Sequence, residues 1–144
     1  MTAILGHGAP QARRSAVPSM WRRALPAWGL MAVAMSLNGI FRVTVLVPRW
    51  GEVWAGVASA ASGIALIQLI ARQAMLPTSV RQRARIALLW LILTVAFEFT
   101  FGHYVDRKPW PELLANYDLL AGHLWPIVLA SLVAAPFVWG RHHD

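Results

Sequence analysis

Several polar side chains lie inside long apolar stretches of the sequence, where an unpaired polar group is costly and therefore points to a role. Asn38 and Arg42 are four residues apart, so they share one face if their stretch is helical. Glu98 lies in another apolar stretch, at a similar distance from its end. A carboxylate and a guanidinium at one level in apolar surroundings pair, because each alone is strongly penalised. We therefore expect Arg42 and Glu98 to be in contact.

A second group of polar residues follows Glu98 along the chain. His103 lies near the end of the Glu98 stretch, and Asn116 and His123 are seven residues apart, which returns to the same side of a helix. We expect the polar residues to gather in the outer half of the fold, leaving the inner half almost wholly apolar. The candidate binding residues are Asn38, Arg42, Glu98, His103, Asn116, Tyr117, Asp118 and His123.

The residue types limit the chemistry of such a cluster. The sequence has no Cys, which excludes thiolate metal sites, iron–sulfur clusters and thiol catalysis. Glu98, His103 and His123 are of metal-binding type, but no HExxH, HxxE or paired-histidine spacing supports a metal site. A haem between the two histidines also has no accompanying motif. We therefore assign no cofactor, no metal and no catalytic residue, and leave a metal or haem at these histidines as open alternatives.

The elements that position these residues are long apolar stretches. Hydrophobic residues make up 58% of the 144 residues and charged residues 13%, against about 25% charged in soluble domains. About 20 apolar residues in a helix cross a bilayer core, and such stretches cover about 25–47, 53–71, 86–104 and 113–139. Barrel strands would be shorter and would alternate. The sequence thus predicts an all-α fold, a four-helix transmembrane bundle that runs up-down-up-down.

The distribution of Arg and Lys predicts how the bundle is oriented. Nine of these residues flank one side of the stretches, and three, Arg49, Arg107 and Lys108, flank the other. The positive-inside rule then places both termini in the cytoplasm. Residues 1–20 are expected to be a disordered tail, and residues 21–141 the transmembrane domain. The net charge of +7 comes from short clusters between apolar runs, so we expect no nucleic-acid binding.

A stripe of small residues marks the second stretch. Ala55, Ser59 and Gly63 recur every four residues on one helix face. Small residues at this spacing let membrane helices approach closely. The stripe therefore packs either against another stretch of the same chain or against a second copy.

Short connections at 48–52 and 106–111 require neighbouring stretches to pack antiparallel.

Three patterns in the sequence carry a resemblance. They are NGxxRxxxxxPRxG at 38–51, FEFTFGHYV at 97–105 and WxxLLxxYxxxxGxxWP at 110–126. With these patterns the chain resembles an uncharacterised group of small bacterial four-span inner-membrane proteins, over about residues 25–138. The resemblance implies a bacterial inner-membrane protein in which Asn38, Arg42, Glu98 and His103 define the group, and it implies no activity.

Three hypotheses for function remain open on the sequence. The first is a non-enzymatic structural or accessory subunit, whose polar cluster is architectural and in which Arg42 keeps Glu98 ionised. The second is a small proton-coupled transporter or channel subunit in which Glu98 exchanges protons. The third is a membrane enzyme or redox subunit with a site at the outer face. The expected partners are the lipid bilayer and either further copies of the chain or a larger membrane complex.

Overall fold

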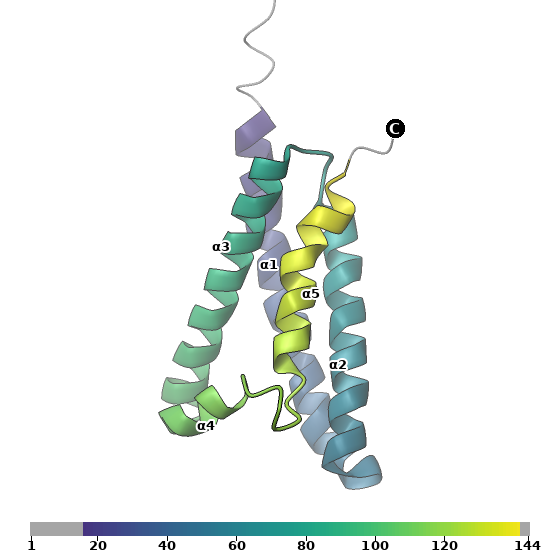
Figure 1. Cartoon of the computed structure of the whole chain (residues 1–144), viewed down its shortest axis with the longest axis vertical. Helices are drawn as coiled ribbons and strands as arrows, with labels where there is room; N and C mark the ends of the chain where they lie inside the picture. Colours follow the sequence, from purple (N-terminus) through teal and green to yellow (C-terminus); the bar gives the residue numbers. More distant parts are fainter. Residues whose placement is uncertain (1–15, 142–144) are drawn as a thin grey trace, which may run out of the picture.

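The protein is mainly helical over the part of the chain that its computed structural model describes, residues 16–141. The described residues form no strand, so the predicted all-α class is confirmed for them. Residues 1–15 of the expected tail lie outside the described residues, and the first helix already begins at Ala16. The helices are α1 (Ala16–Phe41), η1 (Arg42–Leu46), α2 (Val47–Ala74), α3 (Val80–Thr100), η2 (Phe101–Val105), α4 (Trp110–Ala115) and α5 (Trp125–Trp139) (Figure 1).

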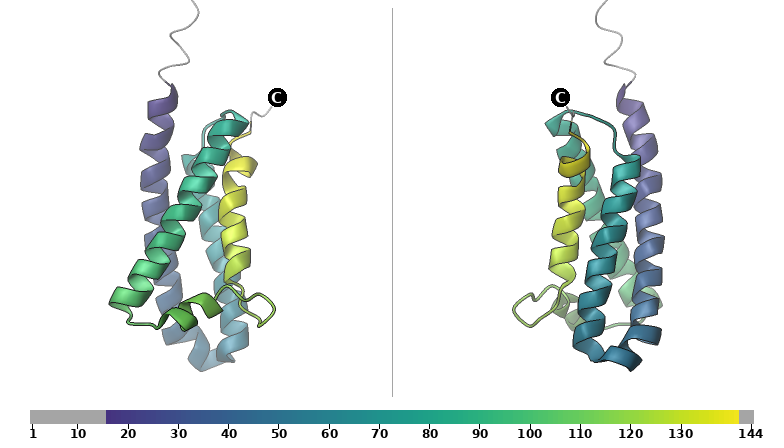
Figure 2. Two further views of the ribbon diagram at one scale, coloured as in Figure 1. Left: turned by 60° about the vertical axis from the view of Figure 1, so that its left-hand side comes forward. Right: turned by 90° about the vertical axis from the view of Figure 1, so that its right-hand side faces the viewer.

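Gly51 separates the first two long helices. Its φ of 76° and ψ of 169° are not helical, and glycine tolerates a positive φ because it has no Cβ. The chain reverses in this region, and α2 returns alongside α1 (Figure 2). The break lies within residues 48–52, where the sequence predicts the first connection.

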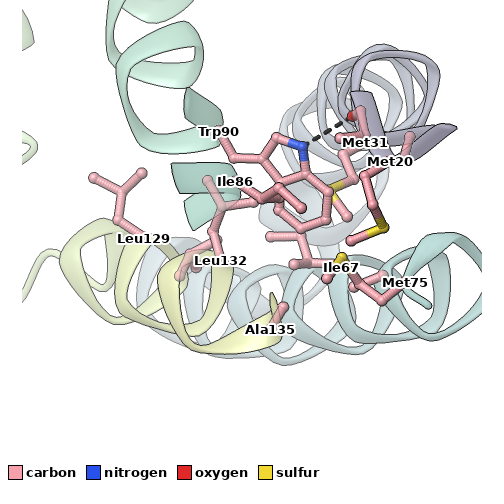
Figure 3. Close-up of a cluster of buried hydrophobic side chains, with 13 residues drawn as sticks. Met20, Met31, Ile67, Met75, Ile86, Trp90, Leu129, Leu132 and Ala135 are labelled. Atoms are coloured by element: carbon pink, nitrogen blue, oxygen red, sulfur yellow. Dashed lines mark hydrogen bonds between the residues drawn. The ribbon is translucent and has the colours of Figure 1, made fainter. Parts of the chain in front are cut away.

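The apolar core lies between the first parts of α1 and α3, the end of α2 and one side of α5. Trp90 is fully buried at its centre, and its indole Nε1 donates to the Ala24 carbonyl oxygen at 2.9 Å, which ties α3 to α1 (Figure 3). The backbone N–H of Thr78 donates to the Gly140 carbonyl oxygen at 3.1 Å, so the α2–α3 connection is fixed to the end of α5. The core residues are Met20, Ala24, Ala27, Met31, Ile67, Ala71, Met75, Ile86, Trp90, Val128, Leu129, Leu132 and Ala135.

The small-residue stripe of α2 is buried inside the chain. Ala55, Ser59 and Gly63 are all buried. A Cβ on Gly63 would lie 2.8 Å from Met35 Cε, and Ser59 bonds to Asn38, so Ser59 and Gly63 face α1. Of the two packing alternatives, the structure therefore shows the intramolecular one.

The helix expected over 113–139 is wrong as a continuous element. α4 ends at Ala115, residues 116–124 form turns, and α5 begins at Trp125. The turns have local causes, since the Asp118 side chain accepts a hydrogen bond from the Ala121 N–H at 3.1 Å and Gly122 has a φ of 89°. Figure 1 shows α3 leaning away from α1 toward its end. In Figure 2, α4 and these turns connect the end of α3 to the start of α5.

Two helical stretches are long and apolar enough to cross a membrane, judged by length and composition. They are Met20–Ala74, which Gly51 divides into two helices, and Val80–Val105. α5 is also apolar but has only 15 residues. The length criterion therefore identifies α3 with η2, and α1 with α2 taken together, as candidate spans.

Candidate functional site

Glu98, near the end of α3, accepts two hydrogen bonds on one oxygen. The Tyr117 hydroxyl donates to Glu98 Oε2 at 2.5 Å, and the Trp125 indole Nε1 donates to the same atom at 2.7 Å. Tyr117 belongs to the turns after α4, and Trp125 is the first residue of α5. The carboxylate thus joins α3 to the chain that leads into α5.

Tyr117 is the hydrogen donor in this pair. Burial raises the pKa of the Tyr117 phenol above its ordinary value, and the hydrogen bond to Glu98 raises it further. The phenol therefore keeps its proton and donates a hydrogen bond to the Glu98 carboxylate. A hydrogen bond to a charged acceptor is stronger than one between neutral groups, so this contact is a strong link between the turns and α3.

The expected contact between Arg42 and Glu98 is wrong. Arg42 lies in η1 and is half-buried, while the ion pair present within residues 16–141 joins Lys108 Nζ and Asp106 Oδ2 at 4.0 Å. α3 leans away from α1 in this half of the fold, as Figure 1 also shows. Equal distances from the helix ends therefore did not bring the two side chains together.

A row of aromatic rings flanks the carboxylate. The Tyr117 ring stacks on Phe99 with centroids 5.8 Å apart, and Phe99 stacks on Trp110 at 6.0 Å. Trp110 in turn stacks on the His103 imidazole at 4.0 Å. Phe99 and His103 are four residues apart, which places both toward the same side of the helix end. The row packs α4 and the turns against α3.

His103 is held by the backbone as well as by the ring beneath it. Its Nδ1 lies 3.0 Å from the Lys108 carbonyl oxygen, and since a carbonyl only accepts, Nδ1 carries the proton in this contact. A Cβ on neighbouring Gly102 would lie 2.6 Å from Leu113 Cδ2, so η2 approaches α4 closely. The imidazole is therefore placed to stabilise the connection between α3 and α4.

Asn38 belongs to a separate cluster between α1 and α2. Its Nδ2 donates to the Ser59 carbonyl oxygen at 2.8 Å and to Ser59 Oγ at 3.2 Å. The Ser62 hydroxyl donates to Asn38 Oδ1 at 3.0 Å. The buried amide is thus satisfied by α2 and joins the two helices without contacting Glu98.

The other predicted residues lie in the turns between α4 and α5. Asn116 is half-buried, whereas Asp118 and His123 are exposed. Asp118 bonds within its own turn. Of the eight predicted residues, the structure therefore brings Tyr117 onto Glu98, with His103 at the far end of the same ring row.

A chain of hydrogen bonds joins α2 to α5 in the half of the fold away from Glu98. The expectation that this half is almost wholly apolar is therefore wrong. Gln68 Nε2 donates to Ser131 Oγ at 2.8 Å, and the Trp139 indole donates to Gln68 Oε1 at 2.8 Å. The Arg72 guanidinium lies 5.5 Å above the Trp139 ring. Gln68 and Ser131 are polar residues inside apolar helices, which was the available signal for this contact between α2 and α5.

Trp110, Phe99 and Trp125 are the site residues that the sequence analysis missed. Their signal was an aromatic spacing near the helix ends, which is also typical of residues at a membrane interface. Within residues 16–141, no group of three or more His, Asp or Glu side chains is arranged to hold a metal ion. The site is therefore a carboxylate bound by neutral donors and flanked by aromatic rings.

Comparison of the chain with protein-family models, with curated proteins and with solved structures finds no match.

Proposed function

We propose that the protein is a multi-pass integral membrane protein that works as a structural or accessory subunit, without catalytic activity of its own. The observation that carries this proposal is an apolar outer surface along the helices. Only 11% of the most apolar window of Met20–Ala74 is buried, and 17% of that of Val80–Val105. A core helix of a soluble protein would bury most of such a window, so lipid is the solvent that fits this surface.

The exposed apolar side chains are distributed over all the long helices. A water-soluble chain would carry polar residues at many of these positions. The large apolar residues that are at least 43% exposed on α1, α2, α3 and α5 include Leu30, Val33, Leu37, Ile40, Val53, Val57, Leu69, Leu88, Ile92, Ile127 and Val138.

The polar side chains of the helices support an architectural role. Asn38 and Gln68 each bond to a neighbouring helix, and no buried side-chain nitrogen or oxygen in the described part of the chain lacks a partner. Satisfied polar contacts of this kind stabilise helix pairs in lipid. Their role in this proposal is to lock α1 to α2 and α2 to α5.

In the proposed topology, the helices run up-down-up-down in a bacterial inner membrane with both termini in the cytoplasm. The nine-to-three bias of positive residues supports this orientation. The partners of the subunit are then the bilayer and a larger membrane complex or further copies of the chain.

Cysteine labelling tests the proposal cleanly, because the chain has no cysteine of its own. Gln73→Cys and Glu112→Cys introduce thiols at exposed positions near the two ends of the bundle. In intact cells, a membrane-impermeant maleimide should label the second variant and leave the first unlabelled until the cells are opened. Alkaline carbonate should leave the protein in the membrane pellet. Release by carbonate overturns the membrane proposal, and the reverse labelling overturns the orientation.

One observation favours a second candidate function, proton exchange at Glu98. Both hydrogen bonds end on Oε2, and Oε1 accepts none from the described residues. Since no described buried polar atom lacks a partner, Oε1 reaches the surface of the fold. Among residues 16–141, no Lys or Arg forms an ion pair with Glu98. A carboxylate with one open oxygen and no such pair inside a membrane is the kind of group that relays protons.

Infrared difference spectroscopy on reconstituted protein separates the two candidates. Proton exchange predicts a carboxylic-acid band that appears and disappears across the physiological pH range and is lost in Glu98→Gln. The architectural role predicts no such band in folded protein. Glu112→Gln serves as the control, because it removes an exposed carboxylate that contacts neither Tyr117 nor Trp125.

A further inference from the structure

Charge is strongly separated along the described chain. Arginines gather at the end formed by the starts of α1 and α3 and the ends of α2 and α5, and no described acidic residue lies there. The arginines at this end are Arg22, Arg23, Arg72, Arg81, Arg83, Arg85 and Arg141. The acidic residues within 16–141 are Glu52, Glu98, Asp106, Glu112 and Asp118, all toward the other end.

Two of these arginines are held by the backbone at the junction of α2, α3 and α5. Arg83 Nε donates to the Thr78 carbonyl oxygen at 3.1 Å, and Arg141 Nε donates to the Phe137 carbonyl oxygen at 2.9 Å. Each bond uses Nε and leaves the two terminal nitrogens without a partner among residues 16–141. A guanidinium held in this way presents a fork suited to two oxygens of one anion.

A third arginine is held by a ring that is itself fixed. The Arg72 guanidinium lies 5.5 Å above the Trp139 ring, within the range of a cation–π contact. The Trp139 indole is bonded to Gln68, which in turn bonds to Ser131. The hydrogen bonds between α2 and α5 therefore fix the Trp139 ring, and the ring positions the Arg72 guanidinium.

The three arginine side chains belong to or contact one short segment, residues 139–141. Arg72 covers Trp139, and a Cβ on Gly140 would lie 3.0 Å from Arg83 Cδ, so the Arg83 side chain passes over Gly140. Arg141 is the next residue. We call Arg72, Arg83 and Arg141 the arginine junction. The carboxyl-terminal dipoles of α2 and α5 favour the charges of Arg72 and Arg141, whereas Arg83 lies in the first turn of α3, where the helix dipole disfavours a cation. Neighbouring cations also repel one another without a counter-ion.

We propose that the arginine junction binds the phosphate of an anionic phospholipid. This inference rests on the proposed membrane location. Leu69 lies three residues before Arg72 on α2, so the two share a helix face. Val138 lies in the last turn of α5, three residues before Arg141. Leu69 and Val138 are 55% and 46% exposed, which leaves an apolar surface beside the cations for the acyl chains. A phosphodiester that carries acyl chains satisfies the charges and this surface together.

The test is lipid binding to the full chain in a neutral detergent, followed by native mass spectrometry. Phosphatidylglycerol should bind more tightly than phosphatidylcholine. The triple variant Arg72→Gln, Arg83→Gln, Arg141→Gln should lose this preference, with about a fivefold loss for each arginine near the surface. The double variant Arg72→Gln, Arg141→Gln keeps the hydrogen bond from Arg83 to the Thr78 carbonyl oxygen and should still lose most of the preference for phosphatidylglycerol. This variant tests the proposal if the triple variant fails to fold.

The matched control removes three positive charges from the opposite end, Arg49→Gln, Arg107→Gln and Lys108→Gln, and should keep the preference. Equal binding of both lipids to the wild type, or the same loss in the control, overturns the inference. If inorganic phosphate at the same concentration displaces phosphatidylglycerol from the protein, the ligand of the arginine junction is a free phosphate and not a lipid. Carbonate release of the wild-type chain would instead overturn the membrane proposal, whereas a chain that stays in the membrane without preference contradicts only the lipid site.

Discussion

The Tyr117 hydroxyl lies 2.5 Å from Glu98 Oε2, so a residue in the turns after α4 is bonded to the last part of α3. The Trp125 indole reaches the same oxygen at 2.7 Å. One carboxylate therefore determines how the turns, α5 and α3 lie relative to one another. The first two predictions test this contact and its independence of Arg42.

Tyr117→Phe should lower the free energy of unfolding by about 1.5–3 kcal/mol, the range for a hydrogen bond to a charged group. Urea unfolding in a mild detergent, followed by circular dichroism, measures the change. Tyr104→Phe is the matched control, since Tyr104 is 72% exposed and should tolerate the same change. Equal effects of the two substitutions would mean that the Tyr117 hydroxyl contributes nothing specific.

Arg42→Gln and Glu98→Gln should have additive effects on the free energy of unfolding, within about 0.3–0.5 kcal/mol, because the two side chains form no ion pair. A double-mutant cycle measures this coupling. The cycle of Glu98→Gln with Tyr117→Phe is the positive control and should give a coupling of about 0.5–3 kcal/mol. A coupling of that size between Arg42 and Glu98 would contradict the structure.

Trp90→Ala should destabilise the protein by about 3–5 kcal/mol, because it empties the centre of the core and removes the bond to the Ala24 carbonyl. Trp54→Ala should change stability by less than about 0.5 kcal/mol in detergent, since Trp54 is 68% exposed. Thermal unfolding of the two variants under one condition compares them. A larger effect at Trp54 would indicate that its face packs against protein.

Gly140→Ala should destabilise the end of α5 by about 1–3 kcal/mol, because the new Cβ would lie 2.5 Å from the Pro136 carbonyl oxygen. Gly56→Ala is the control in the middle of α2, where a Cβ meets no atom within 4 Å. This control should be neutral or stabilise by up to about 1 kcal/mol through helix propensity. Chemical unfolding of both variants measures the difference, and a neutral Gly140→Ala would show that the backbone adjusts freely.

The parts of the fold that follow from local sequence were predictable. Long apolar runs predict α1, α2 and α3, and the Pro48–Glu52 connection contains the break at Gly51. The buried face of α2 follows from the four-residue spacing of its small residues, because only a close helix approach requires it.

The parts that depend on helix tilt and on competing local bonds were not predictable. Counting residues from a helix end predicts how deep a side chain lies in the bundle, and it placed Arg42 and Glu98 at the same depth. It does not predict how far apart the two helices lie at that depth. The apolar composition of 113–139 is continuous, and it concealed turns that arise from Asp118 and Gly122. The partners of Glu98 were hidden because Trp125 is equally typical of an interfacial residue.

The shortness of α5 has a consequence for the surrounding bilayer. Its 15 residues rise about 22 Å at about 1.5 Å per residue, whereas the hydrocarbon core is about 30 Å thick. In the proposed topology this hydrophobic mismatch is confined to one flank of the protein, since α1 and α2 have 26 and 28 residues. Beside α5, the bilayer must become thinner, or another protein must take the place of the lipid. That flank is therefore where a partner subunit would relieve the deformation, and where headgroups come nearest to Trp125.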